Sequence, residues 1–279
     1  MEDRRSHRRP RPSLLTGELQ DLYVNARVSS PTKPLAGKVA VVTEAGQGIG
    51  RGIADVLAAD GAAVVVTGLQ LSHAQESAEA IRARGQQATC FRQDVLDLSS
   101  TAEVLARAEE AFGSVDILVN NAGAAHQTPF LPVTERSWDF INDINAKAVF
   151  FACQAAGDYF EARGAGKIVN IAPMPGKSPM DEHSAYKALK FSVIGITQSA
   201  AIELAKHNVN VNAVCPGIVR TPIWDNSDPQ QWDRQVGGIP LGRGHYCEDI
   251  GHAVAFLASE RAKNITGASL AVNGGFQIW

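Results

Sequence analysis

The 279-residue chain has little of several features that would assign it to a specialised class of protein. Its four cysteines, Cys90, Cys153, Cys215 and Cys247, lie far apart without CxxC spacing, so we expect free thiols in a reducing compartment rather than a disulfide framework or a metal site. No apolar run reaches the ~18 residues of a membrane span. The net charge of -3 gives no general attraction to nucleic acid or to a membrane surface. These absences predict a cytoplasmic protein without a metal, nucleic-acid or membrane partner.

The first 36 residues differ in composition from the rest of the chain. The opening stretch "MEDRRSHRRPRPS" carries five arginines, and no apolar segment follows them, which argues against a twin-arginine export signal. The stretch "SSPTKPL" has the composition of a linker. We expect residues 1–36 to be a basic extension, either a disordered leader or an arm that docks on a neighbouring subunit. A single folded domain is expected to span residues 37–279.

From residue 38 onward, short apolar runs rich in β-branched residues alternate with helical patterns such as "IGRGIADVLAADG". The expected strands are 38–43, 62–68, 88–95, 115–123, 167–173, 208–217 and 269–275. The interior strands are almost continuously apolar, as in a parallel sheet that is covered on both faces. The pattern predicts an α/β fold, a single doubly wound Rossmann-type domain with a mainly parallel sheet and helices on both faces.

The glycine-rich stretch "TEAGQGIG", Thr43 to Gly50, lies between the first expected strand and the first expected helix. Glycines at such a turn let the backbone approach a phosphate, and the N-terminus of the following helix favours negative charge. A merely tight turn is the alternative interpretation. The strand-turn-helix context favours a dinucleotide site.

Two further motifs fit a site of this kind. "DILVNNAG", Asp116 to Gly123, ends a strand in two amides and a small-residue turn, although by itself it could be a plain turn. In "SAYKALK", Tyr186 and Lys190 are four residues apart and share one helix face. A Lys190 cation is expected to lower the pKa of Tyr186, so that the phenol could exchange a proton with a substrate oxygen.

Together these motifs make the chain similar to the short-chain dehydrogenase/reductase family. The resemblance covers residues 38–276 and rests on "LVNNAG", "YKALK", "AVCPGIVRTP" and the series "PLGR…EDI…AVAFLAS…ITG…L.VNGG", in the family's order and spacing. It implies hydride transfer between a nicotinamide cofactor, NAD or NADP, and a small carbonyl or alcohol substrate. It also implies a homo-oligomer, either a dimer or a tetramer.

The resemblance implies a role for each matching residue. Tyr186 would be the general acid/base, Lys190 would hold the nicotinamide ribose and tune Tyr186, and Asn145 would position a water in the proton relay. The implied cofactor-binding residues are Thr43, Gly46, Gln47, Gly48, Ile49, Gly50, Leu69, Asp94, Val95, Asn121, Ala122, Gly123, Tyr186, Lys190, Pro216, Gly217 and Thr221.

One departure from the family pattern lies in "IVNIAPMPG". Pro173 stands where the family has its active-site serine, thirteen residues before the tyrosine. Loss of one such hydrogen-bond donor typically costs about 2.7–4 kcal/mol of transition-state stabilisation. Ser178, Ser184 and His183 are near in sequence, and we take His183 as the first candidate to replace the serine, against the alternative of a solvated loop histidine.

A second departure is Glu44, where the family has glycine. Its carboxylate would repel a pyrophosphate unless it turns away, meets a cation such as Arg51, or accepts a hydrogen bond from a ribose hydroxyl. The second strand ends near Gly68 and Leu69 without the acidic residue typical of NAD sites or the arginine typical of NADP sites. The absence of a basic residue favours NAD slightly.

The segment after Thr221 is the expected substrate lid. Trp224 and Trp232 in it indicate either a flat or aromatic ligand or ordinary packing.

Three functions stay open from the sequence. The first is an NAD(P)-dependent oxidoreductase with an atypical active site. The second is a non-redox enzyme on the same fold (a dehydratase, isomerase or cyclase) that uses Tyr186 as acid/base. The third is a catalytically weak binding subunit, against which the retention of Tyr186, Lys190 and Asn145 argues.

Overall fold

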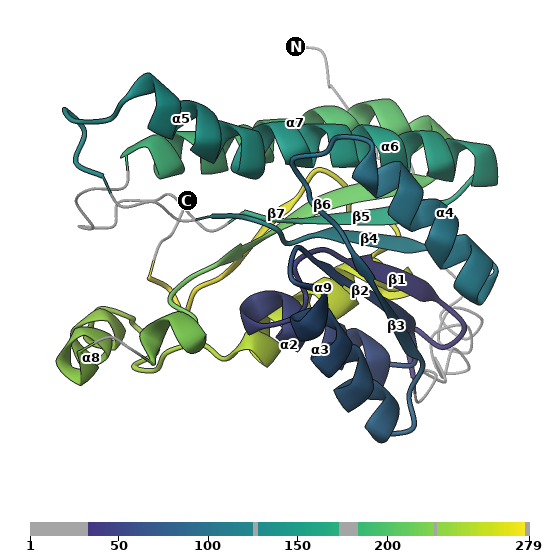
Figure 1. Cartoon of the computed structure of the whole chain (residues 1–279), viewed down its shortest axis with the longest axis horizontal. Coiled ribbons are helices and arrows are strands. Elements are labelled where there is room, and N and C mark those ends of the chain that lie inside the picture. Colours follow the sequence, from purple (N-terminus) through teal and green to yellow (C-terminus); the bar gives the residue numbers. More distant parts are fainter. Residues whose placement is uncertain (1–32, 125–127, 173–183, 226–227, 277–279) are drawn as a thin grey trace, which may run out of the picture. The chain divides into compact units, whose positions relative to one another are not determined.

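The computed structural model describes residues 33–124, 128–172, 184–225 and 228–276. The compact unit that contains them begins at Lys33. Its centre is a seven-stranded sheet in the order β3-β2-β1-β4-β5-β6-β7, in which every pair of neighbouring strands is parallel (Figure 1).

The strands form where the sequence is apolar and β-branched. Their bounds are β1 (Val39–Val42), β2 (Ala63–Gly68), β3 (Ala88–Arg92), β4 (Ile117–Asn120), β5 (Gly166–Ile171), β6 (Val209–Pro216) and β7 (Ser269–Val272). Every residue of β1, β2, β4 and β6 is buried, as both faces of a covered parallel sheet require. Each of the seven predicted strands is confirmed.

Helices connect the strands and cover the sheet. They are α2 (Gly48–Ala59), α3 (Leu71–Ala83), α4 (Ser100–Phe112), α5 (Glu135–Asn142), α6 (Ala148–Arg163), α7 (Ser184–Leu204), α8 (Pro229–Gly237) and α9 (Cys247–Ala258). Between α5 and α6 the chain forms a π-helical turn, η1 (Asp143–Lys147). Short 3-10 turns are η2 (Ala205–His207), η3 (Pro222–Trp224) and η4 (Glu260–Ala262).

Two hydrophobic cores lie on opposite faces of the sheet. One joins α2, α3 and α9 to the strands through residues such as Ile81 and Val254, and the other joins α4, α6 and α7 through residues such as Leu105 and Phe160. Figure 1 shows the two helical layers on either side of the sheet. The predicted α/β doubly wound fold is therefore confirmed.

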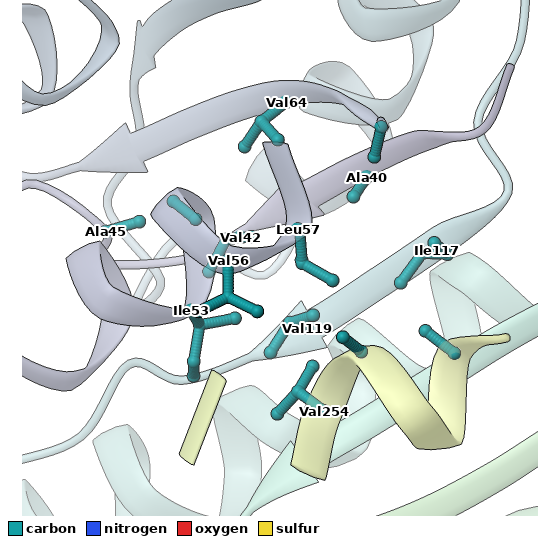
Figure 2. Packing of buried hydrophobic residues seen from close by; sticks show 14 of the residues in the cluster. Ala40, Val42, Ala45, Ile53, Val56, Leu57, Val64, Ile117, Val119 and Val254 are labelled. Atoms are coloured by element: carbon teal, nitrogen blue, oxygen red, sulfur yellow. The ribbon is translucent and has the colours of Figure 1, made fainter. Parts of the chain in front are cut away.

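Helix α2, which carries the glycine-rich turn at its start, packs closely in the first core. Ile53 and Leu57 are fully buried near Val42 of β1, Val119 of β4 and Val254 of α9 (Figure 2). Burial of an aliphatic side chain of this size contributes roughly 1.5–3 kcal/mol. This packing fixes the position of the helix N-terminus relative to the sheet.

The strand order reverses between β1 and β4, since β2 follows β1 on one side and β5 follows β4 on the other. In open α/β sheets, ligands bind at such a switch point, outside the carboxyl ends of the strands. Thr43 directly follows β1 and Asn121 directly follows β4. The fold therefore places the two motifs "TEAGQGIG" and "LVNNAG" side by side.

Within the described part of the chain, the segment Ala188–His207 is long and apolar enough to span a membrane by length and composition alone. Most of it belongs to α7, which packs on β6 through buried residues such as Val193 and Ala201. An apolar helix that covers a sheet passes the same test, so this segment is no evidence for a membrane protein. All four cysteines are free, and Cys153 and Cys215 are buried.

Candidate active site

A cavity of about 540 Å³ opens at the carboxyl ends of the strands, beside the β1–β4 switch point. The sequence-predicted residues that line it are Gln47, Gly48, Ile49, Gly50, Leu69, Asp94, Val95, Asn121, Ala122, Gly123, Tyr186, Lys190 and Thr221. These residues come from six separate stretches of the chain, and the fold brings them to one place.

The glycine-rich turn forms one wall of the cavity at the start of α2. Gly48 has a φ of +57°, in the left-handed region that favours glycine, and the methyl group of Thr221 lies on its open side. A Cβ atom at Gly50 would lie 2.5 Å from Asn121 Nδ2, so only glycine fits there. The turn thus brings backbone N–H groups and a helix N-terminus to the cavity, an arrangement suited to phosphate.

Thr43 lies beneath the cavity and joins the ends of β1 and β4. Its buried hydroxyl oxygen accepts hydrogen bonds from the backbone N–H groups of Asn121 (2.9 Å) and Ala122 (3.0 Å). Asn121 Nδ2 donates in return to the carbonyl oxygens of Thr43 (2.9 Å) and Glu44 (3.1 Å). These bonds hold the glycine-rich turn to the β4 turn, so Thr43 and the Asn121 side chain position the site rather than face its interior.

Glu44 has a φ of +50°, although left-handed backbone costs a residue with a side chain about 1–2 kcal/mol. Its carboxylate reaches the end of β2, where Oε1 accepts a hydrogen bond of 2.9 Å from the Leu69 backbone N–H. Among the described residues Glu44 forms no ion pair, so the suggested pairing with Arg51 is not formed. Glu44 lines both the main cavity and an adjoining one of about 190 Å³.

Asp94 and Val95 follow β3 and line the same end of the cavity as Leu69. The Asp94 carboxylate accepts a hydrogen bond from the Leu96 backbone N–H at 3.0 Å, which fixes the turn after the strand. Together with Glu44, these residues form the end of the cavity farthest along the sheet toward β3.

Tyr186 and Lys190 stand one turn apart on α7, with Lys190 Nζ 5.3 Å from the centre of the Tyr186 ring. Burial raises the pKa of Tyr186 well above its usual range and lowers the pKa of Lys190 to about 8. In the chain by itself the pKa of Tyr186 is therefore raised and not lowered, because burial disfavours the charged form of both groups.

Asn145 is fully buried in the π-helical turn η1. Its Nδ2 donates to the carbonyl oxygens of Ala124 (2.9 Å) and Ile141 (3.0 Å), while Oδ1 has no hydrogen-bond partner among the described residues. A Cβ atom at Gly123 would lie 2.9 Å from Asn145 Oδ1 and 3.2 Å from Lys190 Nζ. Asn145 and Lys190 therefore converge on the same small residue of the β4 turn.

Four predicted cofactor residues do not line the main cavity. Thr43 is buried beneath it, and Gly46 lines the adjoining cavity with Glu44. Pro216 ends β6, and Gly217 packs so tightly that a Cβ atom there would lie 2.8 Å from the backbone of Asn273.

The stretch that holds the family's serine position lies outside the described residues. Pro173, Ser178 and His183 belong to it, and the side chain of Ser184 is likewise not described. The exchange of serine for Pro173 and the suggested role of His183 therefore stay predictions from the sequence.

Several residues that line the cavity were not among the site residues predicted from the sequence. Phe140 and Ile144 come from α5 and η1, Ile171 ends β5, and Pro222 and Ile223 begin the expected lid; Glu44, Leu96 and Ala124 complete the lining. The spacing of four between Phe140 and Ile144 is a helical signal that could have indicated a shared face. These side chains make the space beside Tyr186 largely apolar.

Trp224 and Trp232 of the expected lid contact each other rather than line this cavity. Their rings are 5.1 Å apart in an edge-to-face arrangement, and Trp224 Nε1 donates to the Val219 carbonyl at 3.0 Å. The Arg220 guanidinium lies 5.2 Å from the centre of the Trp232 ring. Of the two alternatives, the packing interpretation fits this geometry.

The comparisons with known proteins agree with the fold and the site. The sequence profile of the family described as "Enoyl-(Acyl carrier protein) reductase" matches residues 44–277. The chain belongs to the short-chain dehydrogenase/reductase family. Since its relatives are named dehydrogenases and reductases, it is an oxidoreductase of that type.

Individual relatives match over nearly their whole length. L-2,3-butanediol dehydrogenase of Corynebacterium glutamicum is 40% identical over 252 residues, which cover 85% of this chain and 98% of the relative. A 3-oxoacyl-[acyl-carrier-protein] reductase of Staphylococcus aureus is 37% identical over 245 residues, 86% of this chain and 98% of the relative. A crystal structure assigned as a short-chain alcohol dehydrogenase of Sinorhizobium meliloti 1021 superposes with a TM-score of 0.82 at 37% identity, covering 88% of this chain and 98% of that one.

The residues present fit the nicotinamide dinucleotide that this family implies. One wall of the cavity offers the glycine-rich turn and the start of α2. At the opposite end the buried Asn145 Oδ1 lacks a partner among the described residues, and Gly123 leaves room beside it and Lys190. A cavity lined by a glycine-rich turn and by the polar side chains of Tyr186 and Lys190 suits a ligand with a phosphate-bearing part and a polar ring system.

Proposed function

We propose that this protein is an NAD(P)-dependent oxidoreductase that interconverts a small carbonyl compound and its alcohol. The observation that carries the proposal is one cavity of about 540 Å³ that joins the glycine-rich turn to Tyr186 and Lys190. A dinucleotide bound at the turn would extend toward the two side chains that handle the proton. The family relatives named as dehydrogenases and reductases support the same reaction class.

The chain's own residues would bind, orient and move a proton. The backbone of the turn at Gly48 would bind the pyrophosphate, and Lys190 would hold the ribose next to the nicotinamide. When bound, the cofactor supplies or takes up the hydride. The Tyr186 phenol would give a proton to the substrate oxygen or take one from it, and the buried Asn145 would orient the relay behind it.

The lining near the reacting centre favours a substrate with an apolar group next to its carbonyl. Phe140, Ile144, Ile171 and Ile223 provide this apolar surface. Phe140 and Ile223 are 53% and 70% exposed, so they could bury against a bound substrate. The tryptophans of the lid contribute packing rather than a stacking surface.

The serine position occupied by Pro173 makes this site atypical within the family, and we keep His183 as the proposed replacement donor. A His183→Ala variant with unchanged turnover would remove that role. We also propose that the cofactor is NAD rather than NADP. Neither cavity beside Gly68 and Leu69 has an arginine among its described lining residues, whereas a 2′-phosphate requires a cation.

Calorimetric titration with NAD and NADP, followed by an absorbance assay on a panel of ketones and secondary alcohols, tests the proposal. We expect binding of a nicotinamide dinucleotide and redox turnover on apolar members of the panel. If neither dinucleotide binds, the proposal is wrong. Tight binding without any redox turnover would favour the alternative of a non-redox enzyme that uses Tyr186 as acid/base.

A cytoplasmic homo-oligomer is the assembly that we propose. The outer face of α6 and α7 exposes Phe150 and Ile202 beside a shallow cavity of about 480 Å³. Exposed apolar groups on two neighbouring helices support pairing of two copies through this face. Sedimentation velocity would detect a dimer or tetramer, and a monomer at all concentrations would contradict the assembly.

A further inference from the structure

Glu44 places a carboxylate where the second strand of the sheet ends without an acidic residue of its own. Gly68 ends β2 and has no side chain. The Glu44 side chain, from the glycine-rich turn, fills this place: a Cβ atom at Gly68 would lie 3.6 Å from Glu44 Oε2. We propose that Glu44 is the residue that binds the adenosine ribose hydroxyls of NAD and excludes the 2′-phosphate of NADP.

The carboxylate is held in position without being neutralised. One oxygen, Oε1, accepts the hydrogen bond from the Leu69 backbone N–H at 2.9 Å, and Glu44 has no ion-pair partner among the described residues. The second oxygen, Oε2, is therefore available as an acceptor for hydroxyl donors. A fixed carboxylate with a free lone pair is the group that recognises a ribose diol.

The surroundings of Glu44 offer little compensation for a second negative charge. The adjoining cavity of about 190 Å³ is lined by Glu44, Gly46, Gln47, Gly68, Leu69, Gln70 and His73. No arginine or lysine belongs to this lining. A phosphate on the ribose would meet the Glu44 carboxylate at short range, and like charges at such range repel.

The backbone supports a functional reason for Glu44. Its φ of +50° is a conformation in which glycine would be unstrained, yet the chain carries a side chain there. Strain of this kind is retained most often where a side chain has a task. Glu44 contacts Leu69, which is 25 positions away in the sequence. A residue of the glycine-rich turn thus supplies the carboxylate that the end of β2 lacks.

This inference rests on the proposed dinucleotide function, and binding measurements separate the two. Dissociation constants for NAD and NADP, and for the fragments AMP and adenosine 2′,5′-bisphosphate, are measured by calorimetry on the full-length wild-type protein. We expect a preference for NAD over NADP, and for AMP over the bisphosphate, of at least about tenfold.

Two substitutions remove the charge in different ways. Glu44→Gln keeps the acceptor for the Leu69 N–H but loses the charge, and Glu44→Gly removes the side chain where glycine fits the backbone. In both variants we expect the preference for NAD over NADP to fall by about tenfold or more, through weaker NAD binding and stronger NADP binding. Thermal melting checks that both variants fold.

A rescue and a matched control complete the test. In Glu44→Gly/Gly68→Asp the carboxylate comes from the end of β2, where a Cβ atom meets only ordinary contacts, and the preference for NAD should return. Glu76→Gln removes an exposed carboxylate from α3, outside both cavities, and should leave both dissociation constants unchanged.

The outcomes divide clearly. A preference that survives in both Glu44 variants, or a wild-type protein that prefers NADP, overturns the role of Glu44 while the oxidoreductase proposal stands. Absence of binding by either dinucleotide overturns both. A loss in the Glu44 variants that the Gly68→Asp change restores supports the inference.

Discussion

The two ends of the main cavity are built in different ways. At the reacting end, Tyr186, Lys190 and Asn145 stand on helical segments, and Asn145 and Lys190 are only 0% and 3% exposed. At the adenosine end, Glu44 and Leu69 meet in turns at the surface. Proton transfer needs atoms held in a fixed geometry, whereas recognition of a sugar needs only the right group within reach. Under the proposed function, the group that recognises the ribose would come from the glycine-rich turn rather than from the end of β2, while the groups that move the proton stay on the helical segments.

The largest expected effect is a loss of catalytic activity when Tyr186 is changed, without a loss of dinucleotide binding. Tyr186→Phe should lower kcat/KM by about 10²–10⁴-fold, because the proton donor is lost, while the dissociation constant of the dinucleotide changes by less than about twofold. Steady-state kinetics and calorimetry measure the two effects. Tyr246→Phe is the control, since Tyr246 is exposed and lies outside the cavity. Full activity of the Tyr186 variant would remove its role in proton transfer.

A smaller effect is expected for the hydrogen bonds of Thr43 that join the glycine-rich turn to the turn after β4. Thr43→Val removes the buried hydroxyl that accepts the N–H groups of Asn121 and Ala122, and should lower the free energy of unfolding by about 1–3 kcal/mol. Thr43→Ser keeps the hydroxyl and should cost less. Urea unfolding of the three proteins measures the difference. A loss in Thr43→Ser without a loss in Thr43→Val would show that the methyl group, rather than the hydrogen bonds, matters.

The smallest expected effect is a change with pH in the contribution of Lys190 to the free energy of unfolding. The pKa of Lys190 is lowered to about 8 by burial, below that of the unfolded chain. Below pH 8 Lys190 is protonated in both the folded and the unfolded state, so the folded state carries the full cost of burying the cation. Above pH 8 the unfolded state binds more protons than the folded state, so the free energy of unfolding rises with pH. Lys190→Met lacks this penalty.

The advantage of Lys190→Met in free energy of unfolding should therefore shrink by about 1 kcal/mol between about pH 7 and about pH 9. Urea titrations of both proteins across this range, which lies below the titration of Tyr186, measure the trend. An advantage that is constant or grows with pH would contradict a lowered pKa of Lys190.

Local signals in the sequence were sufficient for much of the fold. The run Val39–Val42 is apolar throughout and Ile117–Asn120 is apolar up to its last residue, and each forms a buried strand. The spacing between Tyr186 and Lys190 placed both on one helix face, because a helix relates residues four apart. Family resemblance then collected the distant motifs into one site.

Other features depend on contacts that no local pattern encodes. The partner of Glu44 is Leu69, not Arg51, because the left-handed turn aims the carboxylate at the end of β2. The edge-to-face contact of Trp224 with Trp232 depends on how η3 meets α8. The raised pKa of Tyr186 comes from burial, which depends on how the whole chain packs around α7.

The π-helical turn η1 has a consequence for how this enzyme can diversify. It lies between α5 and α6, and together the three segments form a continuous helical stretch from Glu135 to Arg163. The wider turn of η1 rotates the side chains of α5 about the helix axis relative to those of α6. The apolar face of α6 packs on the sheet, while α5 presents Phe140 to the cavity. Under the proposed function, substitutions on α5 would alter substrate preference without changing the orientation of α6, the helix that supports the core.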